Sequence, residues 1–524
     1  MKKYFWLFIY AVITLVLVLH HEVWRDEAQV WQLCTHLSVI DLFKHLVNEG
    51  HPSFFYLLNM PFAKLGFPIL AMQIICWLAS CGAVYLILNK SPFNKTTKII
   101  LITSGMFLYF FPVIARSYSI LPLMVFLLAI LYPKQKEHPY WYATIIFLMA
   151  NTHVIMLGFA GMLTLMFVWE NLWKNRKEFV IEKDSQKTVT LNLFQGRKIC
   201  QIINILKTSN IRCYIYSSLI ALFGLFSVLL QLHGTTSSNV FISFDLKDVI
   251  ANIINVFTKF FVASFDSSYA EVFEPLILNS LQTVLVLFSL FLFIFLFMLI
   301  FKNNKKLFLI SFLGVLFQFL IYILAYSKCV LSVRTFSAYI IVVFALWCVL
   351  NQNDMTEKMR RTINIALIIF FLLTTLNGVR FAILDYRYSY SGGKETAQFI
   401  ESDIEKDALL LTDNVNIMYD VSILPYLNKS RFVYTLLDSD FIKYVVWNEK
   451  VYQYLAGSNY DDYVRYMKQE DEKFKTDNIY LISTYFLNEV LLVNDFKNFK
   501  LIFVSKPAIL KSEKYYIYKY MGNN

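Results

Sequence analysis

The sequence predicts a polytopic α-helical membrane protein with about eleven spans and a small α/β domain at its C-terminal end. Of its 524 residues, 57% are hydrophobic and only 16% are charged, and the mean hydropathy is +0.52. An ordinary soluble chain has about 25% charged residues. The apolar residues also gather in segments long enough to cross a bilayer, and this pattern stops near residue 385. These observations exclude a soluble globular protein.

Eleven apolar segments have the composition of membrane spans, because a helix needs about 20 mainly apolar residues to cross the hydrocarbon core. The first segment follows Lys2 and Lys3 and resembles a signal sequence, but it lacks an A-x-A cleavage pattern, so we expect it to be retained as an anchor. The segments lie near 4–20, 69–89, 98–114, 118–132, 140–156, 157–172, 213–232, 280–301, 307–326, 335–350 and 362–383.

The formal net charge of +11 is explained by the orientation of these spans. Lys and Arg are concentrated in alternate loops, above all between residues 173 and 212, and the N-terminal lysines belong to the same set. Loops rich in basic residues remain in the cytoplasm. The N-terminus is therefore predicted to be cytoplasmic and the C-terminal domain extracytoplasmic. We expect membrane lipids as partners and no nucleic acid.

Residues 1–384 are predicted to form the membrane domain, and residues 385–524 a separate extracytoplasmic domain. The tail is charged and Tyr-rich, and its alternating strand-like and helix-like pieces are typical of a small α/β domain. Strands are predicted at Asp407–Leu411, Phe432–Leu436, Ile479–Ser483, Leu501–Val504 and Tyr515–Tyr520, and helices at Lys394–Glu405 and Asp461–Glu472.

The first outer loop, residues 21–68, contains the most informative residues. A helix is predicted over Glu27–Leu37, with the carboxylates Asp26 and Glu27 at its start, where the helix dipole favours negative charge. Taken alone, such a pair is more often a helix cap than a catalytic group. Its position at the bilayer surface also suits a general base for an acceptor hydroxyl.

A second helix is predicted in the same loop, from Ser38 as N-cap to Gly50 at the C′ position. Glu49 and His51 flank this stop, and Pro52 suits the first turn of a third helix. The two short helices bring both acidic positions toward the outer membrane boundary.

Five motifs in this order resemble those of the GT-C glycosyltransferases, within them the bacterial group related to protein O-mannosyltransferases and lipid A aminoarabinose transferases. The resemblance covers residues 1–383 in order and topology, and it implies a bacterial inner membrane. The motifs are WRDEAQVW from Trp24, EGHPSFFYLL from Glu49, Ala115-Arg116-Ser117-Tyr118, Asn151-Thr152-His153 and Leu331-Ser332-Val333-Arg334-Thr335.

The resemblance implies roles for the acidic residues of the loop. Asp26, with Glu27 beside it, falls on the position of the base or acceptor-positioning group. Glu49 falls on the second acidic position of the same loop. His51, which directly precedes Pro52, is a candidate substrate-binding residue.

The resemblance also implies a binding site for a lipid-linked phosphate. Arg116, followed by Tyr118, falls on the family's outer-end arginine, and Arg334 falls on a second basic position that we assign to the donor phosphate. His153 is a further candidate for substrate binding. From the residues alone, Arg116 also fits an anchor to lipid headgroups, and His153 a polar interface residue.

No cofactor is predicted, and no metal is assigned. Glu49, His51 and His153 could converge on a divalent ion, but no HxH or HExxH spacing is present. No phosphate-loop or Rossmann motif is present, and no DxD motif lies on the predicted inner side, which favours a lipid-linked donor over a nucleotide sugar. The seven cysteines are scattered, and only a bridge between Cys34 and Cys329 is conceivable.

The function expected is transfer of a monosaccharide from a polyprenyl-phosphate donor to a hydroxyl of an extracytoplasmic acceptor, which is a glycan, a lipid or a protein. One alternative is a transporter or flippase of lipid-linked glycans, although the predicted spans carry almost no ionisable residues away from their ends. Another is a polymerase or O-antigen ligase, which the acidic loop at 233–279 keeps open. The tail domain is expected to affect acceptor choice without supplying the base.

Overall fold

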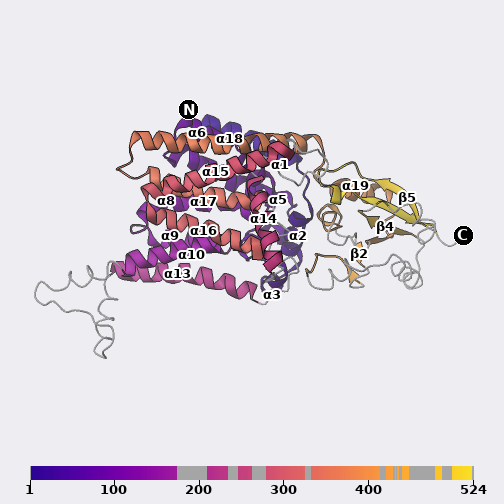
Figure 1. Cartoon of the computed structure of the whole chain (residues 1–524). Coiled ribbons are helices and arrows are strands. Elements are labelled where there is room, and N and C mark those ends of the chain that lie inside the picture. Colours follow the sequence, from indigo (N-terminus) through magenta and orange to yellow (C-terminus); the bar gives the residue numbers. More distant parts are fainter. Residues whose placement is uncertain are drawn as a thin grey trace, which may run out of the picture.

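The computed structural model describes residues 2–173, 209–233, 246–262, 279–324, 332–412, 420–428, 431, 433–435, 440–447, 478–484, 486 and 499–521. Long helices form a bundle, and a small sheet lies beyond one end of it (Figure 1). Helices α1 (Lys2–His20) and α18 (Glu357–Arg387) run along the bundle and finish at the end that adjoins the sheet. The short helix α2 (Arg25–His36) lies at the same end.

Each of the eleven predicted apolar segments is helical over most of its described residues. Among the described residues, seven helices are long and apolar enough to cross a membrane, or up to nine if each bent pair of helices is one span. The protein is therefore a multi-pass membrane protein. The other bundle helices are α5 (Leu70–Lys90), α6 (Lys95–Thr103), α7 (Phe111–Val113), α8 (Leu121–Leu131), α9 (Pro139–Ala150), α10 (Leu157–Val168), α13 (Ser209–Leu232), α14 (Leu246–Val262), α15 (Asn279–Asn303), α16 (Lys305–Leu324) and α17 (Ser332–Leu350).

The difference between eleven and nine has a local origin. The segments at 140–156 and 335–350 fall among the shorter apolar helices. In the first of them, α9 ends at Ala150, and Asn151 caps it before the chain turns. A third short helix, α14, lies within the predicted outer loop at 233–279. The sequence does not predict it as a span, because Lys247 and Lys259 interrupt its apolar pattern.

A close helix contact fixes α18 near the predicted site. A Cβ at Gly378 would lie 2.2 Å from the Cα of Gly105, between α6 and α7. Backbones approach this closely in membranes only where residues are small. The contact holds α18 against the chain just before α7, which leads on to Arg116, and Asp385 follows two turns later on α18.

The first outer loop folds as predicted into three short helices. They are α2, α3 (Val39–Glu49) and α4 (Phe54–Lys64). The Ser38 side chain accepts a hydrogen bond from the Asp41 amide and caps α3, and Gly50 ends α3 with φ 67°, a conformation that glycine adopts without steric cost. The third helix begins after Pro52, at Phe54.

The C-terminal region contains a six-stranded mixed sheet in the order β3-β2-β1-β4-β6-β5. β1 is parallel to β2 and β4, whereas the outer pairings are antiparallel. The five predicted strands and the helix predicted at 394–405 are confirmed, and the helix predicted at 461–472 lies outside the described residues. The elements are α19 (Gly393–Asp403), β1 (Leu409–Thr412), β2 (Val433–Thr435), β3 (Asp440–Phe441), β4 (Ile479–Ser483), β5 (Phe499–Val504) and β6 (Tyr516–Tyr520).

This sheet region has a hydrophobic core of its own, and it also packs directly on α2. Gln29 of α2 pairs with Val445 through two hydrogen bonds of 2.7 and 2.9 Å. The amide of Arg25 donates to Glu513 Oε1 at 3.1 Å. The helix that carries Asp26 is thus held from both sides, by the bundle and by the C-terminal region.

Candidate functional site

Asp26 and Arg116 meet at the end of the bundle that adjoins the sheet. Asp26 lies in the first turn of α2, and Arg116 lies in extended backbone between α7 and the span that follows. Arg116 Nη2 is 3.6 Å from Asp26 Oδ2, and Arg116 Nη1 donates to the Asp26 carbonyl oxygen. Burial opposes the charge on Arg116, but Asp26 raises its pKa above the ordinary value. Arg116 therefore remains a cation.

The Asp26 carboxylate keeps access to solvent. Its side chain is 20% exposed, whereas that of Arg116 is 9% exposed. Arg25 approaches the other carboxylate oxygen, with Nε 3.5 Å from Oδ1. Asp26 thus lies between two guanidinium groups, and one edge of it can be reached by a substrate.

Two buried histidines lie next to Arg116. The rings of His51 and His153 are 4.8 Å apart, and the Tyr118 ring lies 6.3 Å from His153. Burial lowers the pKa of His51 well below its ordinary value, and the charges of Arg116 and Arg334 lower it further. Burial and the same two cations also lower the pKa of His153. Both imidazoles are neutral at physiological pH.

The tautomer of His153 follows from its backbone contact. His153 Nδ1 accepts a hydrogen bond of 3.3 Å from the amide of Ile155, so the ring proton sits on Nε2. His153 comes directly after Asn151 and Thr152, where α9 ends, and it caps the next turn. The ring can donate one hydrogen bond toward the site.

Arg334 approaches the same histidines from the start of α17. Its carbonyl oxygen accepts from the Tyr322 hydroxyl at 2.9 Å and from Ser337, which fixes the backbone at this point. The residue is buried, and its charge acts on His51, His153 and Tyr118. The two predicted basic positions therefore face one cluster, although they are more than 200 residues apart in the chain.

Glu49 borders this cluster within the loop helices. Its side chain accepts hydrogen bonds from Gln29 at 2.9 Å and from Tyr56 at 3.4 Å, and His45 Nε2 lies 3.2 Å away. Glu49 is also close enough to act on the charge of Arg116. The structure thus gathers Asp26 with Glu49, His51, Arg116, Tyr118, His153 and Arg334.

Glu27 has a different environment from its neighbour Asp26. Its side chain is fully buried, and both oxygens have partners. Oε1 accepts from the amide of Ala115 at 2.5 Å, and Oε2 accepts from the amide of Trp24 at 3.2 Å. His21 Nε2 lies 3.1 Å from Oε2. Glu27 therefore ties the start of α2 to the residue before Arg116 and leaves no oxygen open to a substrate.

His21 and Asp385 extend this buried network and were not identified from the sequence. His21 Nδ1 is 2.7 Å from Asp385 Oδ2, and the Tyr109 hydroxyl donates to the same oxygen at 2.8 Å. Burial alone would lower the pKa of His21, but Asp385 and Glu27 raise it to about 10. Asp385, a single carboxylate near the end of the last span, was the only sign of this network in the sequence.

Within the part of the chain that the structure describes, no three His, Cys, Asp or Glu side chains lie close enough to hold a metal ion. Cys34 is a buried free thiol that donates to the Tyr56 carbonyl oxygen at 3.3 Å. Cys329, its conceivable partner, lies outside the described residues.

The fold and the site define a multi-pass membrane protein with a charged cluster at one end of its helix bundle. No protein-family model matches the chain, and no curated protein does. The crystal structure of ArnT from Cupriavidus metallidurans bound to undecaprenyl phosphate is similar, with a TM-score of 0.47 and 9% identity over 98% of each chain. The apo crystal structure of ArnT has a TM-score of 0.37 and 9% identity over 99% of this chain and 98% of ArnT.

Proposed function

We propose that the protein is an integral-membrane glycosyltransferase of the GT-C type. In this proposal it moves a monosaccharide from a polyprenyl-phosphate donor to a hydroxyl of an extracytoplasmic glycan, lipid or protein. The observation that carries the proposal is the solvent-accessible Asp26 carboxylate beside Arg116, with Arg334 and two neutral histidines in the same cluster. A carboxylate can accept the hydroxyl proton, and guanidinium groups stabilise a phosphate leaving group.

An apolar groove supplies a place for the polyprenyl chain. It has a volume of about 470 Å³ and lies between α10, α13 and α16. It begins at Leu157, four residues after His153. On α13 it reaches Leu229, two residues before Gln231, whose side chain bonds the amide of Ser53 at 2.8 Å. We propose that the polyprenyl chain lies in this groove, with its phosphate toward the charged cluster.

The proposed reaction needs no group beyond these side chains. The acceptor oxygen forms a bond to the anomeric carbon as the bond between that carbon and the phosphate oxygen breaks. The hydroxyl proton goes to Asp26, and the electron pair of the broken bond leaves on the phosphate, beside Arg116 and Arg334. Glu49 is proposed to orient the acceptor, and His51, Tyr118 and His153 to contact the sugar.

In this proposal, the ion pair between Asp26 and Arg116 makes the general base available only after the donor has bound. The separation of 3.6 Å is longer than a direct charge-assisted hydrogen bond, which spans about 2.7–2.9 Å. A donor phosphate competes for the Arg116 guanidinium and so releases the carboxylate. Asp26 then becomes available for the acceptor proton only when the donor is in place. Glu27 is proposed to position both groups and not to act as a base.

The proposal is tested with purified protein in liposomes. A panel of radiolabelled polyprenyl-phosphate monosaccharides is offered with a membrane extract as acceptor, and wild type is compared with Asp26→Asn. The matched control is Asp41→Asn, the same change at an exposed residue of the same loop. We expect transfer from one donor, loss of transfer in Asp26→Asn and retention in the control.

Two outcomes would contradict the proposal. If no donor is consumed, while labelled lipid exchanges between leaflets equally in all three proteins, the protein is a flippase. If a donor is consumed equally by wild type and Asp26→Asn, the enzyme class holds but the assigned base is wrong.

A further inference from the structure

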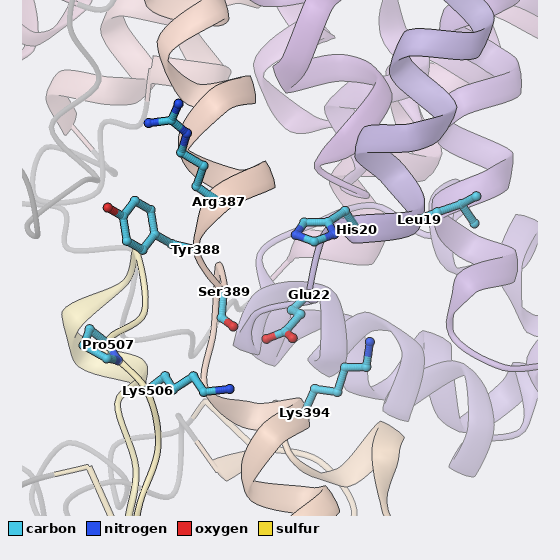
Figure 2. Close-up of a pocket in the computed structure, with 9 residues that line it drawn as sticks. All are labelled: Leu19, His20, Glu22, Arg387, Tyr388, Ser389, Lys394, Lys506 and Pro507. Carbon is cyan, nitrogen blue, oxygen red and sulfur yellow. The ribbon is translucent and has the colours of Figure 1, made fainter.

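A polar cavity of about 430 Å³ lies where the bundle meets the C-terminal region (Figure 2). Its wall is formed by the last residues of α1, by the segment after α18, by Lys394 in the first turn of α19, and by the loop after β5. None of its lining residues belongs to the cluster around Asp26 and Arg116. The cavity is therefore a second place at which this end of the bundle could bind a ligand.

The cavity combines one carboxylate with several cations. Glu22, Lys394 and Lys506 line it, together with His20 and Arg387. In Figure 2 the side chains of Glu22 and Lys506 extend toward the same space, whereas the Arg387 guanidinium points along α18 away from Glu22. Glu395, outside the lining, pairs with Lys506 at 3.5 Å between Oε1 and Nζ, and a bound anion would compete with it. Lys394, Lys506 and Arg387 still outnumber the two carboxylates, so the cavity favours an anionic group.

The carboxylate of Glu22 lacks a donor at one oxygen. Its Oε2 is buried without a hydrogen-bond partner among the described residues. Burial raises the pKa of Glu22, although the charges of Lys394 and His21 and the hydroxyl of Ser389 favour the carboxylate. A buried carboxylate oxygen is costly without a donor. A ligand with an N–H group placed here would remove that cost.

We propose that this cavity binds the headgroup of an aminophospholipid, with the phosphate at Lys394 and Lys506 and the primary ammonium at Glu22. The geometry asks for an anion and an N–H donor in one small ligand, which a phosphoethanolamine group supplies. A phosphoglycerol group has no cation for Glu22. A phosphocholine group has a cation but no N–H donor.

The position of the cavity favours a lipid over a soluble molecule of the same chemistry. His20 and Arg387 are the last residues of α1 and α18, so the cavity opens at the boundary of the membrane domain. Leu19, which also lines it, is 57% exposed, and Tyr388 is 45% exposed. These apolar surfaces suit the glycerol and the first acyl carbons of a lipid.

The inference is tested by titrating the detergent-purified full chain with three lipids of identical acyl chains and counting bound lipids by native mass spectrometry. The lipids are phosphatidylethanolamine, phosphatidylcholine and phosphatidylglycerol. We expect phosphatidylethanolamine to bind about tenfold more tightly than the other two, as one charge-assisted hydrogen bond would give. Soluble glycerophosphoethanolamine should compete only weakly, because it lacks the acyl chains.

Variants separate the two halves of the headgroup. Glu22→Gln should remove the preference for phosphatidylethanolamine over phosphatidylglycerol while leaving the affinity for phosphatidylglycerol unchanged. The double variant Lys394→Gln with Lys506→Gln should weaken both lipids about tenfold. The control is Lys358→Gln, an exposed lysine in the first turn of α18.

Equal affinities for the three lipids in wild type would overturn the inference, and so would an unchanged preference in a folded Glu22→Gln protein. If soluble glycerophosphoethanolamine competes as well as the lipid does, the ligand is a soluble phosphoamine and the lipid assignment is wrong. The comparison of the three lipids uses the wild-type protein, so it does not depend on whether a variant folds. None of these measurements requires transferase activity, so they stand apart from the test of the proposed function.

Discussion

Two adjacent carboxylates at the start of α2 have opposite environments. Asp26 is partly exposed and faces Arg116, whereas Glu27 is fully buried and bonded at both oxygens. Their side chains project in different directions because successive residues of a helix lie about 100° apart around its axis. One carboxylate is therefore available for chemistry, and the other holds the chain segment that carries Arg116.

The buried imidazolium of His21 predicts a specific dependence of stability on pH. Its pKa is about 10 in the folded protein and 6.5 ordinarily. A raised pKa means that its stabilising contribution is complete below pH 6.5 and is lost as the pH rises through 10. The thermal midpoint of wild type, measured from pH 6 to pH 10.5, should fall more than that of His21→Gln.

The comparison between the two proteins cancels the titration of lysines, which occurs in both. Equal pH dependence in wild type and His21→Gln would show that the network holds a neutral imidazole. Glu27 would then not be held in place by an ion pair with His21.

Arg334 provides a second test at the scale of residues. If it binds the donor phosphate, Arg334→Gln should raise the KM for the donor about 10- to 100-fold, since hydrogen bonds to charged groups contribute about 1.5–3 kcal/mol. The control is Arg361→Gln, which changes an exposed arginine near the start of α18. Steady-state kinetics with the cognate donor would decide, and an unchanged KM would mean that Arg334 does not touch the phosphate.

At the scale of elements, the groove between α10, α13 and α16 should select for donor chain length. Gly161 lines the groove, and a Cβ there would meet nothing within 4 Å. Gly161→Leu fills the space and favours the helix by about 1 kcal/mol. We expect a higher KM for a long-chain polyprenyl donor and an unchanged KM for a short-chain analogue.

Gly161→Ala is the matched control for this variant, because it gives a similar gain in helix stability with far less bulk. Equal effects of Gly161→Leu on long-chain and short-chain donors would place the prenyl chain elsewhere. Gly158 is unsuitable for the same experiment, since a Cβ there would lie 2.3 Å from Phe317.

The short helices of the first outer loop were readable from the sequence because their signals are local. The Ser38 cap and the Gly50 stop act within one turn of the chain, and both are confirmed. The charged network was not readable, because His21 and Asp385 are 364 residues apart. An isolated carboxylate near the end of a span looks the same whether it faces lipid headgroups or a buried histidine.

At the scale of the whole molecule, the C-terminal region is a support for α2 as well as a separate sheet. The sequence predicted its strands, but not its contacts with Arg25 and Gln29, which depend on the tertiary fold. Removing the region would take away these partners of α2. A truncation would therefore mix loss of support with loss of any role in acceptor choice, and point variants are the cleaner test.

Glu513 accepts the hydrogen bond from the Arg25 amide, and its titration should make the docking of the C-terminal region on α2 depend on pH. Burial raises its pKa from the ordinary value of 4.5 to about 7. Its stabilising contribution is therefore complete below pH 4.5 and is lost as the pH rises through 7. Glu513→Gln, which resembles the protonated form, should have a higher thermal midpoint than wild type at pH 8 and a similar one at pH 5. A lower midpoint at pH 8 would contradict this account.

The most direct test of the central claim is the turnover of Asp26→Asn at saturating donor and acceptor, measured with donor affinity in the same preparation. If Asp26 is the base, kcat should fall about 10²- to 10⁴-fold, while the donor dissociation constant changes little or decreases, since Arg116 loses a competing partner. Turnover within a few-fold of wild type would show that another group accepts the proton, and the assignment of this cluster as a transferase site built around Asp26 would fail.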